Sequence, residues 1–141
     1  MSKSDKIAAM VEKFRGRSLD AHYLGYFDFF NRQLFYEAHD VLENLWLPIR
    51  REPDGAFYKG LIQLAGAFVH LQKNRLHPAA ALFKMARTNL EPFVPTRSHL
   101  DVTRVLMLID DWLNRLEAGQ FTVNPLTTSH APRLELPGAF D

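Results

Sequence analysis

A histidine and a glutamate four residues apart are the first residues of this chain whose types and spacing could do chemistry. His39 and Glu43 lie in a segment, residues 34–47, whose apolar positions recur every three or four residues, as in an amphipathic helix. Side chains four apart on a helix are neighbours. Because Phe35 and Trp46 flank the pair on the apolar side, we expect both polar side chains to be at least half buried. A buried charge without a partner is costly, so each should have one.

The next apolar segment supplies candidate partners. The connection between the two segments is short, so we expect the helices to pack antiparallel. In that register Gln63 falls opposite His39, and Tyr58 or Lys59 falls opposite Glu43. We therefore predict a buried polar seam between the two helices, in which Lys59 is placed to neutralise Glu43.

The far end of this seam holds a second histidine. His70 follows Gln63 by seven residues, which is about 10 Å along a helix axis. We therefore expect His70 to lie beside Asn31 and not beside His39.

A divalent metal ion is one candidate occupant of the seam, although the sequence does not identify a cofactor. Imidazole nitrogen and carboxylate oxygen are both accepted by zinc or iron, so His39 and Glu43 are candidate ligands. Two ligands are too few, because a catalytic zinc has three from the protein. His70 completes the candidate metal set only if its side chain approaches His39, against the register above. Glu37 and Asp40 are expected to face water.

Acid–base chemistry is the other candidate. Glu43 could orient His39 as a general base, while Gln63 and Lys59 polarise a substrate, so these four residues form the candidate catalytic set. A seam that only fixes the register between two helices would use the same residues, and buried polar groups are commonly satisfied in this way. The residues themselves leave both interpretations open.

The elements that must position these residues are helical. Glycine and proline divide the chain into apolar-striped segments, and no strand-like alternation appears, so the predicted fold class is all-α. We expect a single-domain bundle of about five helices centred on residues 34–47 and 57–71. Ser4 is expected to begin the first helix, Asp54 to cap the central one, and Ser98 with Asp101 to form a capping box for the last.

The domain organisation follows from where glycine and proline end the last helix. Residues 1–119 are expected to form the bundle, and residues 120–141 an extended tail. The tail is too apolar for a free linker, so we expect it to pack on the bundle or on a partner subunit. A homo-oligomer or a protein partner therefore stays open.

Composition excludes several classes. The 141 residues include no cysteine, which excludes disulfides and thiolate metal sites, and the formal net charge of +1 gives no reason to expect a nucleic-acid partner. Lys13, Arg15 and Arg17 make the first helix basic, which is typical of a solvated face. With no long apolar stretch at the start or elsewhere, we expect no membrane association and a cytoplasmic location.

The run FYEAHDVLENLW (residues 35–46), followed by FYKGLIQLAGAFVHLQKN (residues 57–74), resembles a bacterial and archaeal family, domain of unknown function 309. The resemblance covers roughly residues 26–90. The matching motif positions are Glu37, Ala38, His39, Glu43, Trp46, Lys59, Gly60, Leu61, Ile62, Gln63, His70 and Asn74. Asp40 replaces the usual glutamate, and Lys73 stands where the family often has glycine.

The resemblance implies a small multihelical bundle and a bacterial protein. The family is sometimes labelled a predicted metal-dependent hydrolase because of these histidine and glutamate residues. Two functions follow as hypotheses: a metal-dependent hydrolase that uses the seam, or a non-catalytic helical module that binds a protein partner. An enzyme needs the seam to open into a cleft, whereas a seam that only sets register can be sealed.

Overall fold

Apolar stripes separated by glycine and proline produce a predominantly helical chain. The computed structural model describes residues 2–138, and 66% of these residues are helical. The α-helices are α1 (Lys3–Met10), α2 (Ala21–Asn31), α3 (Phe35–Trp46), α4 (Gly55–Gln72), α5 (Leu76–Leu90) and α6 (Val102–Ala118). Short 3-10 turns occupy Glu12–Phe14, Leu47–Ile49 and Glu91–Phe93, and β1 (Thr96–Arg97) pairs antiparallel with β2 (Leu100–Asp101).

The predicted fold class is confirmed at the level of a mainly helical protein, and two details differ. The described part of the chain has six α-helices where about five were predicted. It also has one small hairpin, which is too short to show strand periodicity in the sequence. None of the described helices is both long and apolar enough to span a bilayer.

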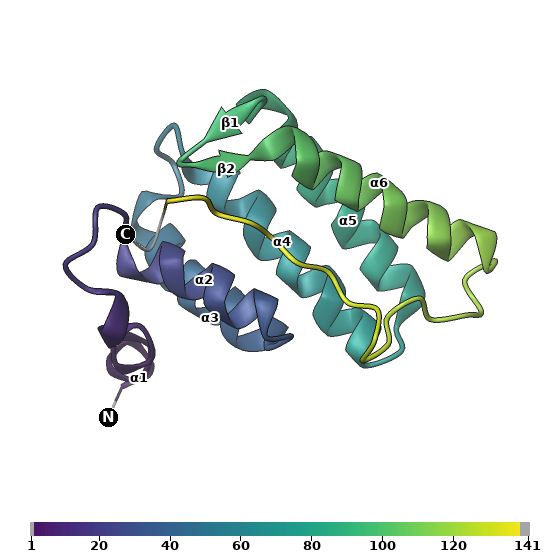
Figure 1. Cartoon of the computed structure of the whole chain (residues 1–141), viewed down its shortest axis with the longest axis horizontal. Helices are drawn as coiled ribbons and strands as arrows, with labels where there is room; N and C mark the ends of the chain where they lie inside the picture. The colour runs from purple at the N-terminus through teal and green to yellow at the C-terminus, as the bar shows by residue number, and fades with distance from the viewer. Residues whose placement is uncertain (1, 139–141) are drawn as a thin grey trace.

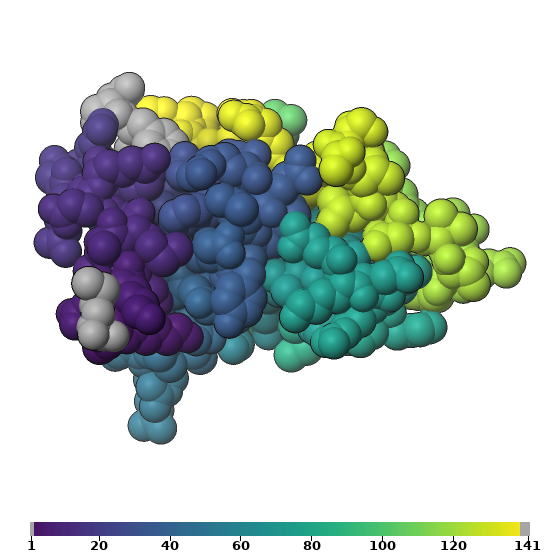
Figure 2. Space-filling model, turned by 90° about the horizontal axis from the view of Figure 1, so that it is seen from below, coloured from purple at the N-terminus to yellow at the C-terminus, as the bar shows by residue number. Residues whose placement is uncertain are grey.

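Helix α4 is the centre of the bundle. It carries apolar residues around most of its circumference, as expected of a helix buried on several sides. Helices α3 and α5 pack against it, α2 packs on α3, and α6 packs on α5 (Figure 1). The space-filling view shows the blue α2 and α3 region between the purple N-terminal residues and the teal α5 region (Figure 2).

One aromatic ring joins four of these helices to α4. The Phe68 ring lies 5.7 Å from Phe30 of α2, 5.1 Å from Phe35 of α3, 5.1 Å from Phe83 of α5 and 5.0 Å from Trp112 of α6, measured between ring centroids. Three of the four contacts are edge-to-face, a geometry that aromatic pairs favour. Phe68 therefore links the main helices through a single side chain.

Close approach between α4 and α5 depends on a glycine. A Cβ atom at Gly60 would lie 2.7 Å from Leu90 Cγ and 3.3 Å from the Ala86 carbonyl oxygen. Both distances are shorter than ordinary van der Waals contact, so only glycine lets the two backbones pack at this separation.

Two helix starts differ from the predictions. Ser2, not Ser4, caps α1, with its Oγ accepting from the Asp5 backbone N–H at 3.1 Å. Asp54 makes no capping hydrogen bond, because its carboxylate pairs with Arg97.

The start of the last helix is a further correction. Asp101 caps α6 alone, accepting from the Arg104 N–H at 3.0 Å. Ser98 and His99 both have positive φ and form the turn of the β1–β2 hairpin. Ser98 is therefore not the predicted partner in a capping box.

The chain after α6 runs back across α4 as an extended segment (Figure 1, yellow). Asn31 of α2 holds it with two hydrogen bonds: its Nδ2 donates to the Leu134 carbonyl at 2.9 Å, and its Oδ1 accepts from the Leu134 N–H at 2.7 Å. The Leu134 and Leu136 side chains are buried in the core. In this structure, the described part of the segment lies on the chain's own bundle.

Replacing Phe68 with alanine is expected to lower the free energy of unfolding by about 3–5 kcal/mol, because the cavity would remove contacts to four helices at once. Phe121→Ala removes a ring of the same size that is only partly buried and stacks on His77. Urea unfolding of both variants checks this. Equal losses in the two variants would contradict the central position of Phe68.

Candidate functional site

Helix α3 presents His39 at the edge of its buried stripe. Phe35, Ala38 and Leu42 are buried in the core on the inner side of the helix. Tyr36 and His39 lie next to that stripe, and their rings stack with centroids 6.1 Å apart. The apolar spacing that makes α3 amphipathic therefore also places His39 between the core and the surface.

Two carboxylates flank the His39 ring. Nδ1 lies 3.2 Å from Asp40 Oδ1, and Nε2 lies 3.7 Å from Glu43 Oε2. Because an ionised carboxylate only accepts, the Nδ1 atom must carry the proton in the contact with Asp40. The side chains of His39 and Glu43 are each 30% exposed, which confirms that both are at least half buried.

The burial of Asp40 differs from the prediction. This residue was expected to face water, but its side chain is only 17% exposed and lies between His39 and Lys3, whose Nζ is 3.7 Å away. The one-residue separation from His39 gives no helical-face signal, so the sequence pattern did not reveal this contact. Glu43 is consequently not the only carboxylate that can orient the imidazole.

Helix α4 supplies a stripe of four residues at spacings of four, three and four: Lys59, Gln63, Gly66 and His70. These spacings place all four on one face of the helix. Gln63 is only 6% exposed, and its Oε1 accepts from Asn89 Nδ2 of α5 at 2.7 Å. Asn89 was not among the residues predicted from the sequence; its seven-residue spacing from Leu82 was the available sign that it faces α4.

Lys59 does not pair with Glu43 as predicted. Its Nζ lies over the Trp46 ring, 4.4 Å from the centroid, and it forms no ion pair within residues 2–138. A cation over the face of an indole ring is attracted by the ring's quadrupole. Tyr58, the other candidate, packs against Tyr23, with ring centroids 6.0 Å apart.

His70 is also placed differently. It was expected beside Asn31, but Asn31 binds Leu134, and His70 lines the same cavity as His39. Burial lowers the pKa of His70 below its usual 6.5, and the positive charges of Arg75 and Lys73 lower it further. Its Nδ1 is buried and has no hydrogen-bond partner among the described residues.

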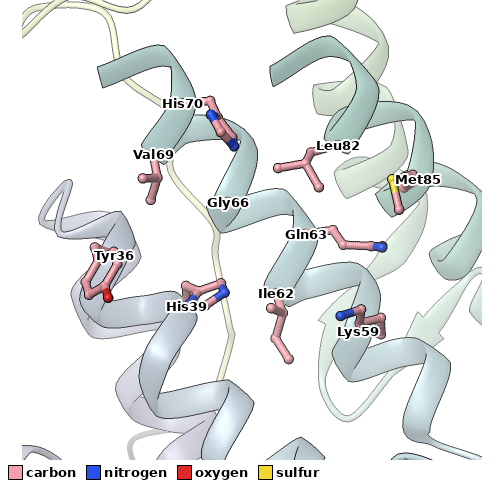
Figure 3. A pocket seen from close by; sticks show the side chains of 10 residues that line it. All are labelled: Tyr36, His39, Lys59, Ile62, Gln63, Gly66, Val69, His70, Leu82 and Met85. Atoms are coloured by element: carbon pink, nitrogen blue, oxygen red, sulfur yellow. The ribbon is translucent and has the colours of Figure 1, made fainter. Parts of the chain in front are cut away.

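A cavity of about 290 Å³ joins these residues between α3, α4 and α5 (Figure 3). Its wall is mainly apolar, with polar groups from α3 and α4. The lining residues are Tyr36, His39, Lys59, Ile62, Gln63, Gly66, Val69, His70, Leu82 and Met85. The structure thus brings His39, Lys59, Gln63 and His70 to one cavity, and Glu43 reaches it only through His39.

A metal ion would need more ligands than this cavity offers. Within residues 2–138 there is no group of three or more His, Cys, Asp or Glu side chains that could hold one. His39 and Glu43 supply two neighbouring donors, and His70, although it also lines the cavity, does not form a group of three with them. The other polar groups of the wall are the Gln63 amide, the Lys59 ammonium and the Tyr36 hydroxyl, which do not complete a typical zinc or iron site. The donor set therefore does not fit a catalytic zinc or iron site.

Comparison with known proteins places this cavity within the segment that matches a family model. The family model described as Domain of unknown function (DUF309) matches residues 23–91, so the resemblance expected from the sequence is confirmed. This range includes every residue that lines the cavity. No curated protein and no solved structure matches the chain.

The lowered pKa of His70 predicts a pH dependence of stability. The unfolded chain, with a histidine pKa near 6.5, binds more protons than the folded chain as the pH falls below that value. The stability that neutral His70 provides is therefore present above about pH 6.5 and is lost as the pH falls toward the lower folded-state pKa. His70→Gln should flatten thermal stability between about pH 7.5 and 5, whereas the exposed His99→Gln should not. Identical pH profiles for all three proteins would contradict burial of His70.

Proposed function

Since residues 23–91 match the family model and contain every wall of the cavity, we propose that this protein binds a small organic molecule between α3, α4 and α5. The cavity itself is the observation that carries the proposal. Small-molecule sites are concave, mainly apolar and furnished with a few oriented polar groups, and they begin at about 300 Å³. The cavity here has about that volume and that chemistry.

The cavity is accessible from solvent. Tyr36 and Met85, which line it, are 55% and 50% exposed, so the rim is at the molecular surface. Figure 3 shows these two side chains on opposite walls, Tyr36 on α3 and Met85 on α5. A seam that only fixed helix register would need no such opening, which favours a binding function over the purely structural alternative.

Acid–base catalysis by His39 is a second candidate, and the contact between His39 and Asp40 favours it. With its proton held at Nδ1 by Asp40, the imidazole leaves Nε2 as the atom that can accept a proton. In a hydrolytic reaction, Nε2 would take a proton from a water molecule as that water attacks a carbonyl carbon, and would return it to the leaving group. Glu43 then lies next to the positive charge on the ring.

The remaining candidate residues have roles in the same scheme. Gln63 and Lys59 would bind or polarise the ligand, and His70 would contact it from the other end of the α4 stripe. The metal-dependent version of the hydrolase requires His39, Glu43 and His70 to share one ion, and the described residues do not supply such a group. We therefore propose the metal-free version. The alternative, a non-catalytic helical module that binds a protein partner, would leave the cavity without a ligand.

Replacing Gly66, which lines the cavity, with a large residue tests the binding proposal. Gly66→Met adds a side chain whose Cβ would lie 3.2 Å from Leu82 Cδ1. The variant should therefore abolish binding of fragments that ligand-observed NMR detects with the wild-type protein. Ala81→Met, at an exposed position of α5 outside the cavity, is the matched control and should bind them normally. Failure of every fragment to bind, or equal binding by Gly66→Met, would contradict the proposal.

The catalytic candidate is tested by the position of the His39 proton. Long-range ¹H–¹⁵N spectra of histidine-labelled protein should show neutral His39 protonated at Nδ1, because Asp40 accepts that proton. Asp40→Ala should shift the proton toward Nε2, whereas Glu43→Gln should leave it at Nδ1. A wild-type His39 protonated at Nε2 would remove the structural support for Nε2 as the general base.

A further inference from the structure

The polar groups on the cavity wall include several hydrogen-bond donors and no carboxylate. Lys59 and Gln63 supply nitrogen donors and Tyr36 adds a hydroxyl at the rim, whereas the Nδ1 proton of His39 is already donated to Asp40. No aspartate or glutamate is among the residues that line the cavity. A ligand that fits this wall must present acceptors and gains from negative charge.

Lys59 carries the positive charge. It is half-buried over the Trp46 ring and has no carboxylate partner in the part of the chain that the structure describes. The carboxylate that the helix register predicted as its partner, Glu43, instead pairs with His39. The charge of Lys59 is therefore available to an anion that enters the cavity.

Gln63 offers a donor of fixed orientation. Its side chain is more than nine-tenths buried, and Asn89 holds the carbonyl end of the amide. The amide nitrogen lies on the cavity wall and finds no acceptor among residues 2–138. Asn89 thus acts as a positioning residue, because its hydrogen bond selects the NH₂ end of Gln63 as the end that meets a ligand.

His70 also lines the cavity. The apolar remainder of the wall, Ile62, Val69, Leu82 and Met85, can cover a hydrocarbon or aromatic body.

We propose that the ligand of this cavity is a small organic carboxylate, an inference that rests on the proposed binding function. Lys59 and the Gln63 amide bind its carboxylate oxygens, and its apolar body lies against Ile62, Val69 and Leu82. One permanent cation matches a monoanion. A phosphate site would be expected to use arginine or the free N–H groups of a helix N-terminus, and the wall has neither, since its residues lie within helices.

The test compares ligands that differ in charge but not in shape. Monocarboxylates from acetate to octanoate, with benzoate, are titrated into the full-length protein beside their primary amides and primary amines, and binding is followed by calorimetry and ligand-observed NMR. The carboxylates should bind about tenfold or more tightly than the matched amides, because charge-assisted hydrogen bonds are about twice as strong as neutral ones. Inorganic phosphate should not displace them.

Variants locate the charge effect. Lys59→Met should remove the preference for carboxylate over amide while circular dichroism shows an unchanged helical fold. Met85→Glu places a negative charge at the exposed rim and should weaken carboxylate binding, and Met107→Glu is its control, since Met107 is 65% exposed on α6 and does not line the cavity. Because both methionines are exposed, neither substitution should disturb the core.

The outcomes separate this inference from the function on which it rests. Amides or amines that bind as tightly as carboxylates, displacement by inorganic phosphate, or an unchanged preference in Lys59→Met would overturn the carboxylate assignment and leave the binding function standing. Absence of binding by all three ligand series, together with a failed fragment screen, would overturn both.

Discussion

The structure depends on burying α4 on nearly every side, with the Phe68 ring as the contact that joins α2, α3, α5 and α6 to it. A helix in this position gains stability from apolar burial along most of its surface. It can therefore tolerate polar residues only where its neighbours separate or where partners satisfy them. That constraint explains why the α4 stripe of Lys59, Gln63, Gly66 and His70 coincides with a cavity.

Glycine sets the shape of this region on the α5 side. Gly60 lets α5 approach α4 closely near Ala86 and Leu90. One to two turns further along α4, Gly66 leaves wall space that a side chain would fill, next to Leu82. The two helices therefore pack closely at Gly60, while Gly66 forms part of the cavity wall. The polar residues that line the cavity are the ones that the sequence pattern identifies as out of place in a core.

Periodicity was sufficient to predict the helical class, the central position of residues 57–71 and the half-burial of His39 and Glu43, because burial leaves a direct imprint on residue spacing. Which side chains contact one another was harder to predict. Lys59 binds over Trp46 and not Glu43, His70 shares a cavity with His39, and Gln63 pairs with Asn89. Each error comes from helix rotation and register, which a short connection constrains only to about one turn. Contacts between adjacent residues, such as His39 with Asp40, leave no periodic signal.

The most direct test of the account is a titration of methyl-labelled protein with a small monocarboxylate such as butyrate, followed by ¹H–¹³C NMR. The account predicts concentration-dependent shifts at the methyl groups of Ile62, Val69, Leu82 and Met85, with those of Met107 and Val123, which lie outside the cavity, unchanged. Shifts at Met107 or Val123 in place of the cavity methyls, or no shifts at any concentration, would contradict the central claim that this cavity is the binding site.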